Sequence, residues 1–317
     1  MKISVLDGFA ANPGDLSWEF LGKYGEYEVF DRTLVSLIPE RARDAGIIVI
    51  NKTPVSRETL EHLPELKFIA VLATGYNVVD TAACDERGIL VANIPSYSVS
   101  AVAQQTFAFI LEYANRVGEH TLSVHSGGWT ASPDFSYQVS PLCELEGKTL
   151  GIIGYGRIGR KVASMADAFG MKTLLHTAHP EKYTDADFVS MDELLRNSDI
   201  VTLHCPLTPE TDKMVNREFI AKMKDGAFLV NTSRGQEVDE VALAEALDSG
   251  KLSGAGVDVL SVEPPKTDNP LLTAKNIYVT PHIAWAAKET RDRLLSILDE
   301  NISAFVAGTP VNIVNMQ

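Results

Sequence analysis

Short runs of β-branched and apolar residues alternate with helix-length segments along the whole chain. In the first part, five such runs are predicted to be strands, at residues 3–6, 27–30, 47–50, 68–72 and 90–93. Strands separated by helix-length segments are joined by right-handed crossovers, which build a mostly parallel sheet with helices on both faces. The pattern therefore predicts a flavodoxin-like α/β domain.

A second alternating series begins at Thr149. It contains six predicted strands, at residues 150–153, 173–175, 200–204, 228–231, 255–259 and 277–280. Six strands of this kind suit a complete doubly wound dinucleotide-binding fold of the Rossmann type. The expected fold class is thus α/β, with a Rossmann domain inserted into a flavodoxin-like substrate domain.

Two long amphipathic segments are placed to connect these domains. Residues 98–117 are apolar on a helical period and contain no Gly or Pro before Gly118, and residues 289–305 repeat that pattern. We expect a discontinuous substrate domain, residues 1–99 and 284–317, interrupted by a dinucleotide-binding domain, residues 100–283. Such a double crossing predicts a ligand cleft between two rigid bodies.

Composition and charge narrow the partners. The 317 residues exceed what one hydrophobic core usually serves. The formal net charge of −14 disfavours nucleic acid and anionic membrane surfaces, and no apolar run is long enough for a membrane span. The three cysteines (Cys84, Cys143 and Cys205) are far apart in the sequence, so we expect neither a disulfide framework nor a zinc site, and a cytoplasmic location.

A glycine-rich turn follows the first strand of the second series. Residues 149–159 read TLGIIGYGRIG, a G-x-G-x-x-G pattern between an apolar strand and a helical run. Gly154 allows a tight turn, Gly156 lets the backbone approach a pyrophosphate, and Gly159 lets helix and strand pack closely. The N–H groups at the helix start, near Arg157 and Ile158, would then face the anion. The turn predicts a bound dinucleotide.

The end of the next strand bears on the choice between NAD and NADP. A carboxylate commonly stands there to bond the ribose 2′-hydroxyl, but this chain has Thr177. Nothing at that position repels a 2′-phosphate, and His179 and Lys182 are close enough in sequence to meet one. The cofactor is therefore NAD or NADP, with a modest preference for NADP, although Thr177 could also bond a bare ribose.

Three polar residues follow predicted strands of the second domain: Arg234, Glu263 and His282. Because ligands in open α/β sheets bind beyond the carboxyl ends of the strands, all three are expected to converge. A guanidinium can grip a carboxylate through a fork of donors, and an imidazolium can give a proton to a forming alkoxide. A neighbouring carboxylate would favour the charged ring. The set predicts reduction of a 2-keto acid.

Each of these residues also has a structural interpretation. Arg234 could form a surface ion pair, Glu263 could be a solvated turn residue, and His282 could end a strand without catalysing anything. The histidine pair at 176 and 179 and the pair His204 and Cys205 lack the further ligands that a closed metal site needs. We therefore predict no metal.

These motifs resemble those of the D-isomer-specific 2-hydroxyacid dehydrogenase family over essentially the whole chain. The resemblance implies that Arg234, Glu263 and His282 are catalytic, and that the loop at residues 73–80, ATGYNVVD, binds the substrate. The substrate-binding residues are expected to be Ala73, Thr74, Gly75, Tyr76, Arg234 and His282. It further implies that Cys205, Pro206 and Thr211 line the adenosine side, that Thr106, Thr232 and Ser233 lie beside the cofactor, and that Asp258 bonds the carboxamide. The full expected cofactor set is Thr106, Gly154, Gly156, Arg157, Ile158, Gly159, Thr177, His179, Cys205, Pro206, Thr211, Thr232, Ser233 and Asp258.

Three stretches are most similar to family members that reduce hydroxypyruvate or oxidise glycerate: residues 260–265, 268–272 and 281–286. The alternatives are reduction of glyoxylate or another 2-keto acid, oxidation of formate or phosphite, or a non-catalytic dinucleotide-sensing module like a corepressor. The family resemblance also implies a homodimer formed through the dinucleotide-binding domain. Its extended arm would be residues 123–143, where Trp129 and Phe135 would be covered by a partner.

Overall fold

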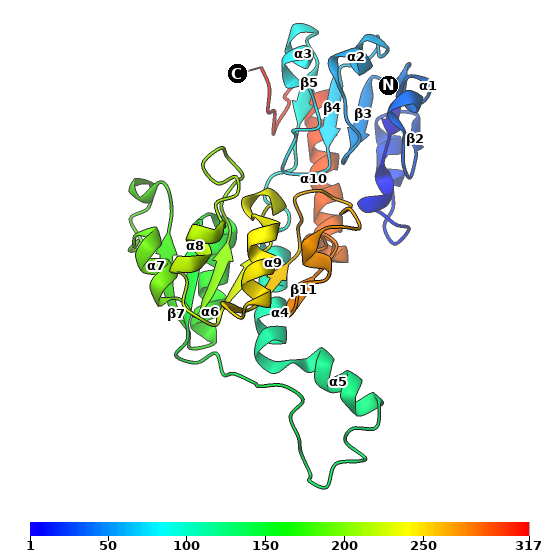
Figure 1. Cartoon of the computed structure of the whole chain (residues 1–317). Helices are drawn as coiled ribbons and strands as arrows, with labels where there is room; N and C mark the ends of the chain where they lie inside the picture. The colour runs from blue at the N-terminus through cyan, green and yellow to red at the C-terminus, as the bar shows by residue number, and fades with distance from the viewer. Residues whose placement is uncertain (317) are drawn as a thin grey trace. The chain divides into compact units, whose positions relative to one another are not determined.

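The computed structural model describes residues 1–316 and contains two parallel-sheet α/β units (Figure 1). One unit comprises Met1–Ser98 and the segment from Ala286 onward, and the other comprises Val99–Trp285. These boundaries lie one and two residues from the expected ones. The two sheets agree with the predicted fold class.

The first unit is built on a five-stranded sheet in the order β2-β1-β3-β4-β5, with every pairing parallel. Its strands are β1 (Ile3–Val5), β2 (Tyr27–Val29), β3 (Ile47–Ile50), β4 (Phe68–Val71) and β5 (Leu90–Ala92). Its α-helices are α1 (Ile38–Ala42), α2 (Arg57–Glu61), α3 (Thr81–Glu86) and α10 (Lys288–Val306). It also contains the 3-10 turns η1 (Gly8–Ala10), η2 (Glu19–Lys23) and η3 (Val35–Leu37).

The central strands of this unit are buried on both faces, which explains their uninterrupted apolar runs. One face packs against α1, α2 and α3. On the other face α10 lies against β4, and the rings of Phe68 and Phe305 stack with their centroids 4.5 Å apart. Beyond α10 the chain runs antiparallel to β5, where the Val314 N–H donates to the Val91 carbonyl at 2.9 Å.

The second unit is built on a six-stranded parallel sheet in the order β11-β10-β9-β8-β6-β7. Its strands are β6 (Thr149–Ile153), β7 (Lys172–His176), β8 (Ile200–Leu203), β9 (Ala227–Asn231), β10 (Leu252–Val257) and β11 (Ile277–Val279). Its α-helices are α4 (Val99–Asn115), α5 (Val117–His125), α6 (Arg157–Ala168), α7 (Met191–Asn197), α8 (Arg217–Lys222) and α9 (Glu240–Asp248). Its 3-10 turns are η4 (Pro180–Lys182), η5 (Gly235–Glu237) and η6 (Pro270–Leu272).

Helices cover both faces of this second sheet. Helices α4 and α6 share one apolar core with the sheet, and α7, α8 and α9 share the core on the opposite face. From β6 the chain first adds β7 on one side, and then β8, β9, β10 and β11 in turn on the other side. The direction in which strands are added therefore reverses between β6 and β8. A reversal of this kind opens a crevice at the carboxyl ends of the strands, where ligands of doubly wound sheets bind.

The long helix predicted for residues 98–117 is present as α4, and a break follows directly after it. Arg116 takes a left-handed backbone conformation with φ of 50°, and a second helix, α5, starts at the next residue and includes Gly118. The Arg116 guanidinium donates to the Tyr278 hydroxyl at 2.6 Å and lies over the ring of Tyr113. These contacts hold the chain at the break, and the segment predicted as an arm, residues 123–143, begins within α5.

Helix α5 and the irregular segment after it extend from the rest of the second unit (Figure 1). Their surface is unusually apolar: Phe135 is 91%, Leu122 70% and Trp129 54% exposed. Within residues 1–316, no helix combines the length and the apolar character that crossing a membrane requires.

Candidate functional site

The glycine-rich turn joins β6 to α6 at the point where the strand order reverses. Gly154 has φ of 96°, and a Cβ there would lie 2.5 Å from the His204 backbone, while a Cβ on Gly159 would lie 2.1 Å from the Gly154 carbonyl oxygen. A Cβ on Gly156 would meet nothing within 4 Å. Gly154 and Gly159 therefore allow close backbone packing, because a side chain would not fit at either position. Gly156 instead borders open space at the start of α6, which has no side-chain cap. This cradle suits a pyrophosphate.

The residues after β7 are those predicted to recognise the ribose of a dinucleotide. The Thr177 hydroxyl accepts from the His179 N–H at 3.4 Å, and the His179 ring lies 3.3 Å from a Glu181 carboxylate oxygen. Both His179 and Glu181 are exposed. The turn that follows carries Lys182. Thr177 thus lies at the strand end with one imidazole and one ammonium nearby in the chain, and its contact with a ribose stays a prediction.

The ends of β8 and β9 are joined by side-chain hydrogen bonds. The Ser233 hydroxyl donates to the Cys205 carbonyl at 2.6 Å, and the Thr232 and Thr106 hydroxyls lie 3.0 Å apart. Thr106 is fully buried and also donates to the Val102 carbonyl. Thr106 is therefore placed to support Thr232 rather than to offer a free hydroxyl. The structure brings Cys205, Thr232 and Ser233 to one strand edge, but their cofactor contacts stay predictions.

Two ionisable side chains at this edge are electrically neutral. Burial raises the pKa of the Cys205 thiol to about 12, so it is not a thiolate nucleophile at neutral pH. Burial also lowers the pKa of His204 to about 3. The loop beyond them is closed by Thr211, which donates to the Pro206 carbonyl at 2.8 Å. Neither group supplies charge for catalysis.

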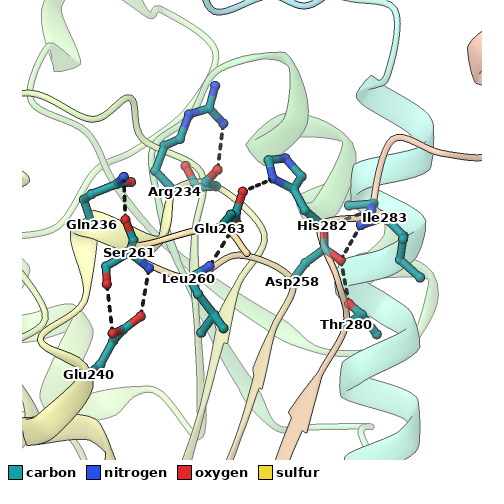
Figure 2. Close-up of polar contacts among 12 residues, drawn as sticks. Arg234, Gln236, Glu240, Asp258, Leu260, Ser261, Glu263, Thr280, His282 and Ile283 are labelled. Atoms are coloured by element: carbon teal, nitrogen blue, oxygen red, sulfur yellow. Dashed lines mark hydrogen bonds and ion pairs between the residues drawn. The ribbon is translucent and has the colours of Figure 1, made fainter. Parts of the chain in front are cut away.

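Arg234, Glu263 and His282 follow β9, β10 and β11, three strands that are neighbours in the sheet. The Nδ1 atom of His282 and the Oε2 atom of Glu263 are 2.6 Å apart, and the other oxygen of Glu263 accepts from the Leu260 N–H at 3.0 Å. Figure 2 shows the guanidinium of Arg234 and the ring of His282 extending from the same edge of the sheet. The structure therefore brings His282 and Glu263 into contact, as expected, and their catalytic roles stay predictions.

Gly235 brings the Arg234 segment against the Glu263 loop. A Cβ at Gly235 would lie 1.9 Å from the Leu260 carbonyl carbon, so only glycine fits there. Arg234 is exposed, and its Nη1 donates to the Ser233 carbonyl at 2.7 Å. Its carbonyl accepts from the Asn231 side chain at 2.8 Å. The guanidinium thus extends from a fixed backbone and keeps donors for a ligand.

The His282 backbone is held in the left-handed region, with φ of 54°. A non-glycine residue in that region costs about 1–3 kcal/mol and persists only where its surroundings impose it. Here the constraint is Asp258, which is 1% exposed. Its carboxylate accepts from the Ile283 and Ala284 N–H groups, each at 2.9 Å, and its carbonyl accepts from the His282 N–H at 2.8 Å.

Asp258 therefore positions the histidine loop in this structure (Figure 2). It also accepts a 2.5 Å hydrogen bond from Thr280, and burial raises its pKa. Its expected contact with a nicotinamide carboxamide stays a prediction. The sequence analysis did not identify this supporting role, because the N–H groups that Asp258 binds lie 25 and 26 residues later in the chain.

Glu240 is a further positioning residue that the sequence analysis missed. Its carboxylate accepts from the Ser261 N–H and hydroxyl, both at 2.8 Å, and from the Asn269 side chain at 3.0 Å. Gln236 donates to the Ser261 carbonyl at 3.0 Å (Figure 2). Ser261 is thus fixed on both sides of its backbone, two residues before Glu263. In sequence, Glu240 is an ordinary acid in the first turn of α9.

The predicted substrate loop belongs to the other unit and follows β4. The Thr74 hydroxyl donates to the Ile94 carbonyl at 3.0 Å, and the Asn93 side chain donates to the Thr74 carbonyl at 2.8 Å. Ala73 and Gly75 are half-buried, and Tyr76 is exposed. The loop is therefore an ordered part of its own unit. Its role in substrate binding stays a prediction.

Among residues 1–316, no group of three or more His, Cys, Asp or Glu side chains is arranged to hold a metal ion. The residues that could hold a cofactor are instead the glycine turn and the strand ends after β7, β8 and β9. The open space at Gly156 fits the phosphates of a dinucleotide.

Comparison with known proteins gives one consistent family. A family model described as D-isomer specific 2-hydroxyacid dehydrogenase, NAD binding domain, matches residues 107–284. A hydroxypyruvate reductase of Blautia hydrogenotrophica is 50% identical over 321 residues, covering 99% of this chain and 100% of the relative. A glycerate dehydrogenase of Methylorubrum extorquens is 42% identical over 315 residues, covering 99% of this chain and 98% of the relative.

Solved structures have the same architecture. The TT0316 protein of Thermus thermophilus gives a TM-score of 0.89 at 37% identity, covering 99% of this chain and 100% of that one. An acyclic imino acid reductase solved with NADPH and D-Arg gives a TM-score of 0.86 at 30% identity, with the same two coverages. Together with the family match, these structures support a nicotinamide dinucleotide as the cofactor.

The different surroundings of the glycines predict different effects of an added methyl group. Gly154→Ala forces an alanine with positive φ against the backbone of His204 and Cys205, just after β8, and should destabilise the fold by about 1–3 kcal/mol or more. Gly156→Ala should fold normally, but it should bind NADH or NADPH at least about tenfold more weakly because the methyl enters the phosphate space. Denaturant unfolding and fluorescence titration measure the two effects. Unchanged affinity in Gly156→Ala would contradict the phosphate assignment.

Proposed function

Because the chain belongs to the D-isomer-specific 2-hydroxyacid dehydrogenase family, we propose that it reduces hydroxypyruvate to D-glycerate with a nicotinamide dinucleotide. The observation that carries the chemistry is the 2.6 Å contact between His282 Nδ1 and Glu263 Oε2, on strands adjacent to the one that presents Arg234. The substrate assignment is supported by the two relatives that are 50% and 42% identical along nearly their whole length.

The contact between His282 and Glu263 supports an assignment of the proton that is transferred to substrate. An ionised carboxylate can only accept hydrogen bonds, so Nδ1 of His282 is the donor to Glu263. The Nε2 atom is then the nitrogen that can give a proton to substrate and regain it from solvent. Glu263 stabilises the positive charge of the doubly protonated ring, and its second oxygen is anchored by the Leu260 N–H. His282 is the proposed general acid.

Arg234 is the proposed carboxylate ligand. Its guanidinium is exposed, and a planar fork of donors matches a carboxylate in geometry and charge. This local cation matters because the chain as a whole carries a net charge of −14 and repels anions. Backbone N–H groups of residues 73–76 are proposed to complete substrate binding.

The proposed reaction combines hydride transfer to carbon with proton transfer to oxygen. When bound, a reduced nicotinamide would supply the hydride that the C2 carbonyl carbon of the keto acid accepts. As negative charge develops on the C2 oxygen, Arg234 stabilises it and His282 transfers the Nε2 proton to it. The neutral ring, still donating from Nδ1 to Glu263, is reprotonated from water. The product is a 2-hydroxy acid. The same steps in the opposite direction oxidise a 2-hydroxy acid to the keto acid.

Removal of the acid should affect turnover rather than binding. His282→Asn should lower kcat for hydroxypyruvate by about 100-fold to 10,000-fold, the usual contribution of a positioned general acid. The Kd for NADH or NADPH should stay within about twofold, since the phosphate turn is untouched. Stopped-flow reduction and equilibrium titration measure the two quantities. Near-normal turnover in this variant would remove His282 from the role.

Substrate choice is tested by steady-state assays of hydroxypyruvate, glyoxylate and pyruvate, each with NADH and with NADPH. The highest kcat/KM is expected for hydroxypyruvate. A higher kcat/KM for glyoxylate would contradict hydroxypyruvate as the preferred substrate. An absence of turnover with every keto acid would favour a dinucleotide-sensing module.

The finer proposal on the cofactor is a modest preference for NADPH. It is supported by Thr177 in place of an acid and by His179 and Lys182 close behind it. Thr177→Asp should raise KM for NADPH at least about tenfold, because a carboxylate would face the 2′-phosphate, and should change KM for NADH far less. Thr177→Ser is the matched control. Equal effects on both cofactors would contradict the proposal.

The proposed assembly is a homodimer that covers the apolar surface of α5 and the segment after it. Its supporting observation is the exposure of Leu122, Trp129 and Phe135 on a part of the chain that extends from its own unit (Figure 1). Replacing Leu122 and Phe135 together by Ser should shift the protein from dimer toward monomer in light scattering after size-exclusion chromatography. The control is Leu34→Ser, an exposed leucine in the other unit. A monomeric wild type would overturn the proposal.

A further inference from the structure

A buried carboxyl group lies next to the strand ends proposed to hold the cofactor. Glu237, in η5, is 0% exposed. Its Oε1 atom lies 3.3 Å from the Ser233 hydroxyl and 3.6 Å from the Cys205 sulfur. Its Oε2 atom is buried with no hydrogen-bond partner among the described residues. Glu237 therefore has fewer hydrogen-bond partners than a buried, ionised carboxylate requires.

The number of available protons indicates its charge. The Ser233 hydroxyl has one proton, which is committed to the Cys205 carbonyl at 2.6 Å because that oxygen has no proton to give. The 3.3 Å contact between Ser233 and Glu237 then needs a proton on Glu237. A protonated carboxyl donates to Ser233 and leaves a neutral carbonyl oxygen at Oε2. A neutral oxygen without a partner costs much less than an ionised one.

The environment of the Glu237 carboxyl also favours its protonated form. Burial raises the pKa of Glu237 from the ordinary 4.5 to about 7. The hydrogen bond from the Cys205 thiol and the positive charge of Arg234 oppose this shift but are weaker than burial. These are the groups that act on the carboxyl from the segments after β8 and β9, and the Cys205 thiol stays neutral itself. Glu237 is thus poised between its two forms near neutral pH.

We propose that Glu237 is a positioning residue that links cofactor binding to a proton: the carboxyl takes up a proton from water when the dinucleotide binds. The inference rests on the proposed placement of the cofactor beside Ser233 and Cys205. Bound phosphates bring negative charge, and the bound cofactor excludes water, and both favour the neutral carboxyl. In that form Glu237 holds Ser233, and Ser233 holds the Cys205 carbonyl, so the cofactor edge is fixed.

The same position connects Glu237 to substrate binding. Ser233 accepts the Arg234 guanidinium at its carbonyl, and Glu237 lies three residues beyond Arg234. Ionisation would place a negative charge close to Arg234 and remove the hydrogen bond to Ser233. We therefore expect the free enzyme to hold a less ordered binding edge at alkaline pH than at pH below the pKa of about 7.

Calorimetric titration with NADH and with NADPH, in buffers of different ionisation enthalpy, measures the protons taken up on binding. The wild type should take up a fraction of a proton near pH 7 and approach one proton above it. Its Kd should rise about tenfold between about pH 6 and pH 8. Glu237→Gln, which is always neutral, should bind without this uptake and with a nearly flat Kd. Glu245→Gln, on the exposed surface of α9, should behave as the wild type.

The outcomes separate this inference from the proposed function. Failure of the wild type to bind either dinucleotide would contradict the proposed function itself. Tight binding with equal proton uptake in wild type and Glu237→Gln would overturn the inference alone. If Glu237→Gln does not fold, infrared difference spectra of the wild type at about pH 8 decide, and a protonated-carboxyl band that grows on binding is expected. An unchanged band would overturn the inference.

Discussion

The hydrogen bond between His282 and Glu263 is the interaction on which the functional account depends. At 2.6 Å it fixes which ring nitrogen is bound to the carboxylate and which remains for chemistry. The rest of the site keeps that bond in place. Asp258 holds the strained His282 backbone, Glu240 and Gln236 hold the loop before Glu263, and Gly235 lets the Arg234 segment approach that loop.

The parallel sheet explains how residues so distant in sequence come to lie at one edge. Arg234, Glu263 and His282 are separated by roughly a strand and a helix or turn each, yet their strands are neighbours and point the same way. Their carboxyl ends therefore share one edge, where the glycine turn after β6 also lies. The Glu263 and His282 loops are each held by a carboxylate, from Glu240 and Asp258, and the Arg234 backbone is held by the Asn231 side chain.

Sequence reasoning predicted the strands well because their signal is local. The run IIVI at β3 and the glycine pattern after β6 carry their meaning within a few residues. It failed where distant contacts decide the structure. The helix predicted for residues 98–117 is present, but the break after it, at Arg116, involves Tyr278, which lies 162 residues away. No residue near Glu240 in the sequence indicates that its carboxylate binds Ser261. Glu237 was missed for the same reason, since its burial is a property of the folded core.

A crystal structure of the enzyme with dinucleotide and oxamate, an unreactive mimic of a 2-keto acid, tests the central claim most directly. The account predicts that the oxamate carboxylate lies on the Arg234 guanidinium. The Nε2 atom of His282 should lie about 2.6–3.2 Å from the oxygen that stands for the ketone, with Nδ1 still on Glu263. Oxamate bound away from Arg234, or a His282 ring turned from Glu263 in that complex, would contradict it.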